Sequence, residues 1–465
     1  MPDFAHWENL LVENQHRLSN FLNIFSIGEI HRLREEIINS AISYTQRLET
    51  IAFEHGIILQ KACGVTSFNK LIMTGHQPTI YHSGILAKNL SLNTFAQETK
   101  TAAINIIIDT DSGNGGNIYY PSILNAEPEV QSISISDNSP LYLYQKIVGS
   151  NEIENTLNLI HTGLTTVSLN FVTAKSKKVL SLYKQLSGMS LCEANTIARR
   201  YLSPSNHYYE LPLSLILKSS YIQTLFSKIL ADGDAFSNQY NQALHTYRLD
   251  HKIKNNANPF PDLKPNETPF WLIDSSKKDR SSFFNSTKPE NCFLAPKAFL
   301  ITLLLRFCLS DLFIHGKGGA KYDQFLDYWV SIYYKMQAPS FVSVSEDRYL
   351  FPDIIEEYEN YLSVLSRRRE ISGHLEKHLR SSLFNTADKS CLNEFLNSKT
   401  QLLSCLQKKD NTSTQRKLLG KEIKALDLCI KDFLNHKLAV PNESKLANMN
   451  TDFLYFREYP FFFFT

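Results

Sequence analysis

The chain has 465 residues, of which 43% are hydrophobic and 20% charged, and its formal net charge is +2 at pH 7. This length allows two or three domains with a large core, and the composition is ordinary for a soluble globular protein. So small a net charge gives no general argument for nucleic acid or an anionic membrane as a partner.

The cysteines and the apolar stretches point to a reducing cytoplasm and to no membrane partner. The seven cysteines are widely spaced without a CxxC pair, which argues against a disulfide framework and against a zinc site. The N-terminus lacks the basic-then-apolar order of a secretory signal. The most apolar stretch, 293–313, is interrupted by Lys297, Arg306 and Asp311, so it predicts a buried helix and not a membrane span.

Residues 1–60 are predicted to form an N-terminal helical segment, because apolar residues recur there at helical spacing between charges. Residues 61–350 are predicted to form an α/β core. Near its start, an apolar run over 71–75 is followed by polar residues and then by an apolar-periodic segment. This order predicts a strand, a tight turn and a helix.

The predicted turn carries the first group of candidate site residues. Gly75 would let the backbone turn closely, and Gly84 would let a ligand approach the helix start, where unpaired amides attract anions. Imidazoles beside such a site could neutralise charge or transfer protons. The alternative is an ordinary connection within an α/β domain. The candidates are His76 and His82 as catalytic residues, and Thr74, Gly75, Gln77 and Gly84 as ligand-binding residues.

Residues 102–109 form an apolar, β-branched run that predicts a strand buried on both faces. The run leads into Asp109 and Asp111 and a glycine-rich loop. Carboxylates at the end of a parallel strand lie where open α/β sheets bind ligands, so both aspartates are catalytic candidates. They would share a face if the strand persisted; the alternative is a polar turn that caps the strand.

The middle of the chain carries weaker signals. Alternation over 128–172 predicts short strands and turns, and 175–250 returns to helical spacing. Tyr240, Tyr247 and His251 would lie near one helical face, as a core stripe or as a pocket wall.

A second candidate group follows the predicted buried helix over 291–313. Three glycines and two lysines predict a flexible cationic loop that could hold a phosphate through backbone amides and ammonium groups. The spacing is not that of a P-loop, and a solvated turn is the alternative. The candidates are Gly316, Lys317, Gly318, Gly319 and Lys321.

Residues 351–440 are predicted to form an antiparallel coiled-coil helical arm. Charge density rises there, glycine and proline become rare, and leucines recur at helical spacing. Residues 441–465 end in an apolar, phenylalanine-rich tail that would aggregate if exposed, so we expect this segment to return to the core. Arg457 would then form an internal ion pair or belong to the site.

These motifs occur in an order that resembles the bacillithiol biosynthesis cysteine-adding enzyme (BshC) family. The resemblance covers Thr74-Gly-His-Gln and its helix, the strand ending in acids, Leu294-Ala-Pro296, Gly316-Lys-Gly-Gly319 and the late helical arm. It implies a Rossmann-like core of the nucleotidylyltransferase type and a coiled-coil arm that forms a homodimer. The cofactor stays open, with a nucleotide such as ATP or ADP as the candidate. His82-Ser-Gly-Ile85 is similar to the HxGH motif of that superfamily, with isoleucine in place of the last histidine.

The chain also departs from the family pattern. The opening motif usually reads Thr-Gly-Gln-Gln, and His76 stands at the first glutamine. The strand-end motif is typically Ser-Glu-Asp-His-Asp, whereas this chain reads Asp109-Thr-Asp-Ser-Gly113. The family's scaffold and pocket position therefore apply to this chain better than its substrate does. In the family, cysteine is added to a glucosaminyl-malate acceptor.

We therefore expect an α/β enzyme that binds a nucleotide or another anionic small molecule and forms an amide-type or nucleotidyl bond. Lys317 and Lys321 would neutralise phosphate, and Asp109 or Asp111 would orient an amine or a metal. A noncatalytic nucleotide or metabolite sensor whose arm docks a partner is the alternative, and a purely architectural coiled-coil dimer is a weaker one.

Overall fold

The computed structural model describes residues 3–464 except 21–26, 68, 114, 126, 137–142, 144, 204, 275–279 and 285–286. The chain separates into compact units. Unit 1 comprises Met1–Leu350 and Phe456–Thr465, and unit 2 comprises Phe351–Tyr455. The last ten residues therefore belong to the same unit as the sheet described next.

Unit 1 is built on a parallel sheet that has five strands within the described residues. These are β1 (Leu71–His76), β2 (Ala102–Ile107), β5 (Tyr209–Pro212), β9 (Leu312–His315) and β10 (Val342–Ser343). Their order across the sheet is β10-β9-β1-β2-β5, and each neighbouring pair is parallel. From β1 the chain adds β2 and β5 on one side and later β9 and β10 on the other. The order therefore reverses between β1 and β9, which is where open α/β sheets leave a crevice at the carboxyl ends of their strands.

Both faces of this sheet are covered, as the apolar run over 102–107 predicts. All six residues of β2 are buried. Along β1, Leu71 and Met73 pack into a cluster with the helices of one face, whereas Ile72 packs with Trp7 and Phe95 on the other face. Alternate residues of a strand point to opposite faces, so a continuous apolar run is what a doubly covered sheet requires.

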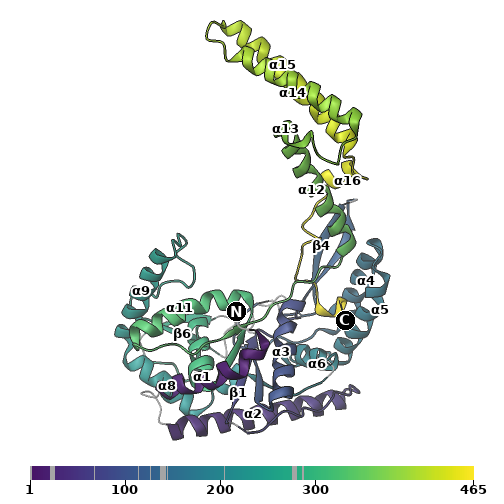
Figure 1. Ribbon diagram of the computed structural model, residues 1–465. Helices are drawn as coiled ribbons and strands as arrows, with labels where there is room; N and C mark the ends of the chain where they lie inside the picture. Colours follow the sequence, from purple (N-terminus) through teal and green to yellow (C-terminus); the bar gives the residue numbers. More distant parts are fainter. Residues whose placement is uncertain are drawn as a thin grey trace. The chain divides into compact units, whose positions relative to one another are not determined.

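Helices surround the sheet in unit 1, and the long helix α2 runs along its outside (Figure 1). The helices are α1 (Trp7–Asn20), α2 (Ile27–Glu54), α3 (Ser83–Thr99), α4 (Ser150–Thr166), α5 (Asn170–Gln185), α6 (Leu191–Tyr201), α7 (Leu213–Ile216), α8 (Ser220–Ala231), α9 (Gly233–Asp250), α10 (Ala298–Leu303) and α11 (Lys317–Tyr333). Short 3-10 helices are η1 (Phe4–His6) and η3 (Phe461–Phe463), and a π-helical turn, η2 (Leu304–Leu309), follows α10. No helix in the described residues has both the length and the apolar character needed to cross a membrane.

Smaller antiparallel sheets complete the described part of unit 1. One pairs β3 (Asn117–Leu124) with β4 (Glu127–Ser134). The other has the order β7-β6-β8, with β6 (Glu267–Asp274) between β7 (Arg280–Phe284) and β8 (Cys292–Pro296).

The structure corrects several predicted elements. Residues 150–172 are mostly helical, in α4 and the start of α5, where short strands were predicted. Buried Ile153, Ile160 and Leu164 lie seven and four residues apart, which is a helical period. The short strand β5 lies within the stretch predicted to be helical.

The apolar stretch over 291–313 is also not one helix. It comprises β8, α10, η2 and the beginning of β9. The residue before a proline favours an extended backbone, so Pro296 at the end of β8 opposes a helix that begins earlier. Apolar content alone cannot separate a buried strand from a buried helix.

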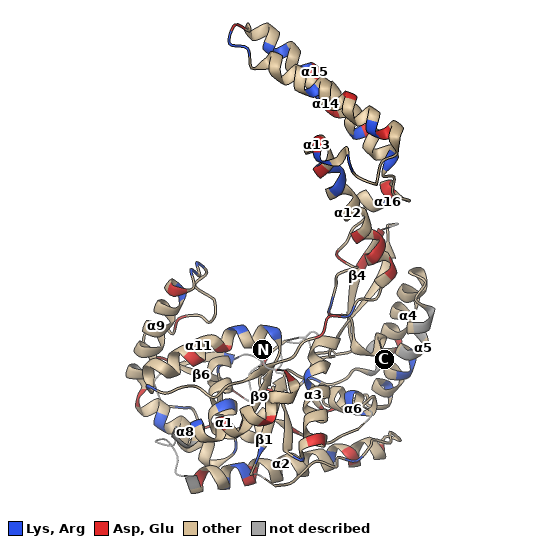
Figure 2. Cartoon of the chain, viewed as in Figure 1, with Lys and Arg blue, Asp and Glu red and all other residues tan. Residues whose placement is uncertain are grey.

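Unit 2 is helical. Its helices are α12 (Pro352–Gly373), α13 (Leu375–His378), α14 (Thr386–Leu406), α15 (Ser413–Lys437) and α16 (Glu443–Ala447). α14 and α15 lie side by side and run antiparallel, because the start of α14 (Asp388) pairs with the end of α15 (Lys437) at 2.6 Å (Figure 1). Charges of both signs are interspersed along these two helices (Figure 2). Residues 407–412 connect the two helices.

A buried carboxylate ties the edge of the parallel sheet to the N-terminal helices. Asp311, only 1% exposed, precedes β9. Its side chain accepts hydrogen bonds from Arg34 of α2 at 2.9 Å and from the amide of Leu71 at 2.8 Å. Asn14 of α1 donates to its backbone oxygen at 2.8 Å. One residue therefore holds α1, α2, β1 and β9 in place.

We expect Asp311→Ala to lower the free energy of unfolding by about 3–5 kcal/mol, because it leaves a buried guanidinium without its partner. Urea titration followed by circular dichroism measures this loss. The matched control is Glu8→Ala, which breaks the exposed Glu8–Lys70 pair and should cost less than about 1 kcal/mol. Equal losses for the two variants would show that Asp311 is not a structural tie.

Candidate functional site

A cavity of about 700 Å³ lies at the carboxyl ends of β1 and β9, where the strand order of the sheet reverses. Both predicted motifs reach it, although more than two hundred residues separate them in the sequence. The cavity is lined by Gly75, His76, Gln77, His82, Gly84, Ile85, Lys88, Ala298, His315, Gly316, Lys317, Gly318, Gly319, Lys321, Tyr322, Ser345 and Arg457. Thr74 is fully buried beneath it and donates its hydroxyl to the carbonyl of Ile314 on β9 at 2.8 Å.

The cavity is positively charged. Its lining includes Lys88, Lys317, Lys321 and Arg457, and no Asp or Glu lines it in the described part of the chain. Coulomb attraction rises inside a cleft whose walls have a low dielectric constant, so these cations favour an anionic occupant.

Two helices begin at the cavity. His82 precedes α3 and accepts a hydrogen bond at Nδ1 from the amide of Gly84 at 3.1 Å. Gly316 precedes α11, and no side chain at this position accepts a hydrogen bond from the first amides of the helix. The stretch Lys317–Lys321 is thus the first turn of a helix and not the flexible loop that was predicted. Unpaired amides at a helix start attract anions, and this correction strengthens the case for an anion site.

Gly84 is required by close packing at the start of α3. A Cβ atom there would lie 2.8 Å from the carbonyl oxygen of Glu346 and 3.0 Å from Nη2 of Arg457. Real Cβ atoms do not come so close to backbone atoms, so only glycine fits without a shift.

Lys88 is the buried cation of the cavity. Its side chain extends from α3, donates to the carbonyl of Gly75 at 2.7 Å, and is only 4% exposed. No carboxylate pairs with it among the described residues. Burial lowers the pKa of Lys88 to about 7, because desolvation penalises the charged form. A buried lysine without a carboxylate partner is costly to keep charged, and lysines with pKa values lowered in this way are typical of functional sites, where an anionic ligand would restore the charge.

The two histidines of the opening motif are held neutral, because burial and neighbouring cations lower their pKa values. Burial and then the Lys88 charge lower the pKa of His76 to about 3, and burial and then Arg457 lower the pKa of His82 to about 4. Nδ1 of His82 accepts the cap hydrogen bond, so the ring proton lies on Nε2. At neutral pH His82 can therefore donate a hydrogen bond from Nε2, and neither ring carries charge.

His315 belongs to the same cavity. It is the last residue of β9, and its Nε2 lies 2.7 Å from a carboxylate oxygen of Asp323. Asp323 also pairs with Arg306. Burial raises the pKa of Asp323, but Arg306 and His315 outweigh burial and leave it below its usual value. Burial lowers the pKa of His315 despite its carboxylate partner, so this ring is neutral as well.

The C-terminal segment contributes the fourth cation. Arg457 donates to Ser345 at 3.2 Å and pairs with Asp347 at 2.9 Å. The amide of Phe461 donates to the carbonyl of Tyr81 at 2.8 Å, which fixes the segment beside the turn before α3. The end of the chain is therefore part of the site wall.

The two aspartates that follow β2 lie outside the large cavity. The strand ends at Ile107, so they do not share a strand face. Asp109 is 2% exposed and accepts hydrogen bonds from the amide and hydroxyl of Ser214, at 2.9 and 2.5 Å. Burial raises its pKa to about 6 despite these bonds. In the described residues, no group of three or more His, Cys, Asp and Glu is placed to hold a metal ion.

Asp111 lines a second, smaller cavity of about 170 Å³, which shares Gln77 and Ala298 with the large one. Its carboxylate pairs with Arg280 at 2.7 Å and accepts a hydrogen bond from Gln77 at 3.2 Å. The Arg280 guanidinium lies over the Trp271 ring, 4.4 Å from its centre. The smaller cavity thus has both an anionic and a cationic wall.

Sequence reasoning missed several residues of the cavity. His315, which directly precedes the glycine-rich motif, was not among the candidates, and Arg457 was left with two possible roles. Lys88 was not considered. Its signal was a lysine four residues after Gly84, on the apolar face of the same helix. Tyr240 and Tyr247, in contrast, are buried in the hydrophobic core, so they are core residues and not a pocket wall.

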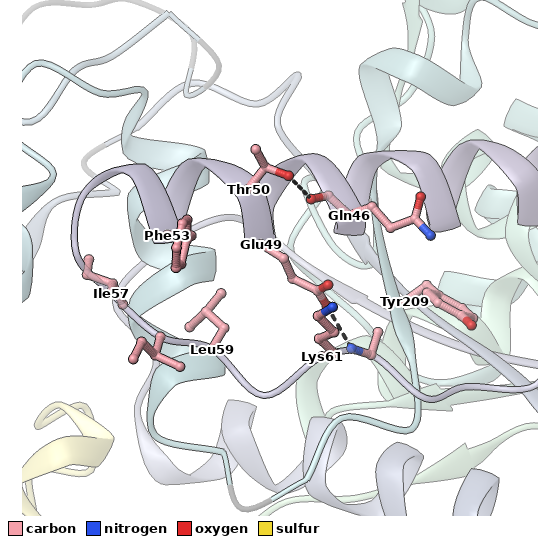
Figure 3. Close-up of a pocket in the computed structure, with 10 residues that line it drawn as sticks. Gln46, Glu49, Thr50, Phe53, Ile57, Leu59, Lys61 and Tyr209 are labelled. Atoms are coloured by element: carbon pink, nitrogen blue, oxygen red, sulfur yellow. Dashed lines mark hydrogen bonds between the residues drawn. The ribbon is translucent and has the colours of Figure 1, made fainter.

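A further cavity, of about 600 Å³, lies between the end of α2 and the segment after it (Figure 3). Two hydrogen bonds join groups of its lining (Figure 3). The amide of Ala62 donates to Glu49 at 2.7 Å, and the hydroxyl of Thr50 donates to the carbonyl of Gln46 at 3.0 Å. The described residues that line this cavity include no cluster of like charges, in contrast to the four cations that line the cavity at β1 and β9.

Comparison with known proteins does not add to this geometry: no family model and no curated protein sequence matches the chain.

We expect Lys88→Met to stabilise the protein at acidic and neutral pH. The folded protein binds the Lys88 proton with a pKa of about 7, whereas the unfolded chain binds it with a pKa near 10.4. The unfolded state holds more protons between these values, so the penalty is full below pH 7 and fades as the pH rises towards 10.

The gain in unfolding free energy should be on the order of a few kcal/mol at pH 6 and much smaller at pH 9.5. Urea titrations of the wild type and the variant at the two pH values measure it. Lys177→Met, which changes an exposed lysine of α5, is the control and should show little difference between the two. A gain that is the same at both pH values would contradict the burial of a charged Lys88.

Proposed function

We propose that this chain is a BshC-like enzyme that binds a nucleotide or another anionic small molecule at the turn between β1 and α3, and forms an amide-type bond there. The observation that carries the anion site is Lys88, a buried ammonium with no carboxylate partner among the described residues. The starts of two helices and three further cations line the same cavity. Together they suit a phosphate or carboxylate group.

The strand order supports a Rossmann-like assignment of the core. Read from β1 outward, the sheet follows the doubly wound pattern in which one half is completed before the other begins. In that pattern, ligands bind at the carboxyl ends of the strands at the point of reversal, which is the position of this cavity. This topology is also the one that the resemblance to the cysteine-adding enzymes implies.

Each cavity would hold one substrate of the bond-forming step. An amide forms when an amine attacks an activated carbonyl carbon, the activating group leaves with its electron pair, and the amine nitrogen releases a proton to solvent. Lys317 and Lys321 would stabilise the leaving anion, and Nε2–H of His82 would donate to it. Asp111 and Arg280 could orient an amine and a carboxylate of a small second substrate in the smaller cavity.

A noncatalytic nucleotide or metabolite sensor is the second candidate. The observation that favours it is Ile85, which lines the cavity where the HxGH motif has its last histidine. Isoleucine cannot donate a hydrogen bond to a transferring phosphate, so binding could persist where transfer does not.

Calorimetric titration with ATP, ADP and sulfate tests the anion site. We expect Lys88→Met to weaken binding by about tenfold or more, the equivalent of about 1.4 kcal/mol for one charge-assisted hydrogen bond. Lys177→Met is the matched control and should bind as the wild type does. If none of the three anions binds the wild type, the anion site does not exist.

Mass spectrometry then separates the two candidates. The wild type is incubated with ATP, cysteine and a glucosaminyl-malate acceptor, and the mixture is searched for a condensed product. A nucleotide that binds and is recovered unchanged, with these and other amine acceptors, would favour the sensor over the enzyme.

We also propose that α14 and α15 form a coiled-coil arm through which two chains associate. Leu418 and Leu428 of α15 are each 59% exposed, and exposed leucines on a charged helical pair are typical of a surface that is covered in an oligomer.

Light scattering coupled to size exclusion should give the mass of two chains for the wild type, and of one chain for the double variant Leu418→Glu, Leu428→Glu. Introduced carboxylates at a buried apolar contact would be desolvated without partners. The control is Leu249→Glu, at an equally solvent-exposed leucine in unit 1 (65%), which should leave the mass unchanged. A wild-type chain that is monomeric at micromolar concentration would refute this arrangement.

A further inference from the structure

His315 is held in one orientation by contacts on several sides. It is 7% exposed, and its Nε2 atom bonds to Asp323, whose carboxylate is in turn fixed by Arg306. The rings of Phe313 and Phe341 lie with their centres 4.6 and 4.9 Å from the centre of the imidazole ring. These contacts leave the ring little freedom to rotate.

The hydrogen-bond pattern fixes where the ring carries its proton. An ionised carboxylate can only accept hydrogen bonds, so Nε2 of His315 donates to Asp323. A neutral ring then has a lone pair on Nδ1. Within the described part of the chain, Nδ1 has no hydrogen-bond partner, although its residue is buried and lines the large cavity.

Nδ1 lies beside the first turn of α11. A Cβ atom added to Gly319 would come within 2.9 Å of it, and the three atoms nearest to that Cβ all belong to the His315 ring. Glycine at this position therefore leaves the lone pair uncovered, next to the amides that would hold an anion.

The polarity of this atom differs from that of the cations around it. Lys88, Lys317, Lys321 and Arg457 can only donate hydrogen bonds, and His82 presents Nε2–H. Nδ1 of His315 presents an acceptor instead. An oxyanion without a proton would place an oxygen lone pair against this nitrogen, whereas one with a hydroxyl group would form a hydrogen bond.

We infer that His315 is a specificity-determining residue, whose Nδ1 accepts a hydrogen bond and so selects an oxyanion that carries a proton, such as a phosphate group, over one that carries none. The inference rests on the anion site of the proposed function and names the class of ligand for it. Asp323 acts through His315, as the positioning residue that keeps the lone pair on Nδ1.

Inorganic phosphate and sulfate separate these two classes of ligand. Both are tetrahedral anions of similar size, but at pH 7 phosphate carries a proton and sulfate carries none. Calorimetric titration of the full-length protein with each anion gives two dissociation constants. We expect phosphate to bind at least about tenfold more tightly, which is the equivalent of one hydrogen bond gained.

His315→Phe is the test variant, because it keeps a ring in the same space and removes the acceptor. We expect the preference for phosphate to fall below about threefold, chiefly through weaker phosphate binding, while sulfate still binds. Since this variant also removes the partner of Asp323, a thermal melt reports whether the protein remains folded.

Gly319→Ala is a second variant, which retains both His315 and Asp323, although its methyl group would stand 2.9 Å from Nδ1 and requires a small shift of the ring or of the helix start. Its methyl group would cover Nδ1, so the preference for phosphate should fall. Gly318→Ala is the matched control: its methyl group would meet no atom within 4 Å, so any change should apply to both anions by the same factor and leave their ratio intact.

The outcomes distinguish this inference from the proposed function. Binding of both anions with equal affinity would overturn the role of His315 and leave the anion site standing. A preference that persists in both His315→Phe and Gly319→Ala would overturn it too. Failure of both anions to bind would overturn the anion site and the inference together.

Discussion

The arrangement around the large cavity depends on one buried cation. The ammonium of Lys88 bonds to the carbonyl of Gly75 on β1, and the aliphatic part of its side chain lies 3.8 Å from where a Cβ atom of Gly316 would stand. The lysine therefore lies between the two glycine-bearing stretches. Its desolvation without a carboxylate opposes folding, and the rest of unit 1 must offset that cost. The amino-terminal edge of the sheet offsets this cost through apolar burial and the Asp311 contacts. This edge lies at the opposite end of the strands from the cavity.

The separation between a stabilising edge and a positively charged edge follows from the topology of the sheet. Parallel strands bring all their carboxyl ends to one edge, and the reversal of strand order separates β1 from β9 at that edge. The amino ends of the same strands are closed by Asp311, Arg34 and the N-terminal helices. One edge of the sheet thus supplies stability, while the opposite edge can carry uncompensated positive charge. The C-terminal segment adds Arg457 to that opposite edge, where its own charge is shared with Asp347.

Sequence patterns over a few residues predicted the strands and helices around the cavity better than they predicted the charges and partners of its side chains. The apolar run of β1 and the glycines before α3 and α11 were visible in the sequence, because turn and helix-start residues act over a few positions. The neutral state of His76 and His82 was not, since it depends on burial and on the charges of Lys88 and Arg457. Asp109 and Asp111 looked equivalent two residues apart, yet the strand ends before them, and each finds a partner more than one hundred residues away. Apolar runs alone also could not separate β8 and β9 from the single helix predicted over 291–313.

The three histidines of the cavity show how a single residue type can take distinct roles once a fold fixes its partners. The carbonyl of Gln77, 3.1 Å from Nδ1 of His76, can only accept a hydrogen bond, so it fixes the proton there. The amide that His82 caps fixes the proton on Nε2, and the Asp323 carboxylate fixes the proton of His315 on Nε2 while its lone pair faces the cavity. None of the three rings is charged at neutral pH, so the positive potential comes from the lysines, the arginine and the starts of the two helices. A ligand is then attracted by charge and sorted by hydrogen-bond polarity, and the two effects reside on different residues. Changes to the lysines should therefore alter affinity for all anions, whereas changes to the histidines should alter the ranking among them.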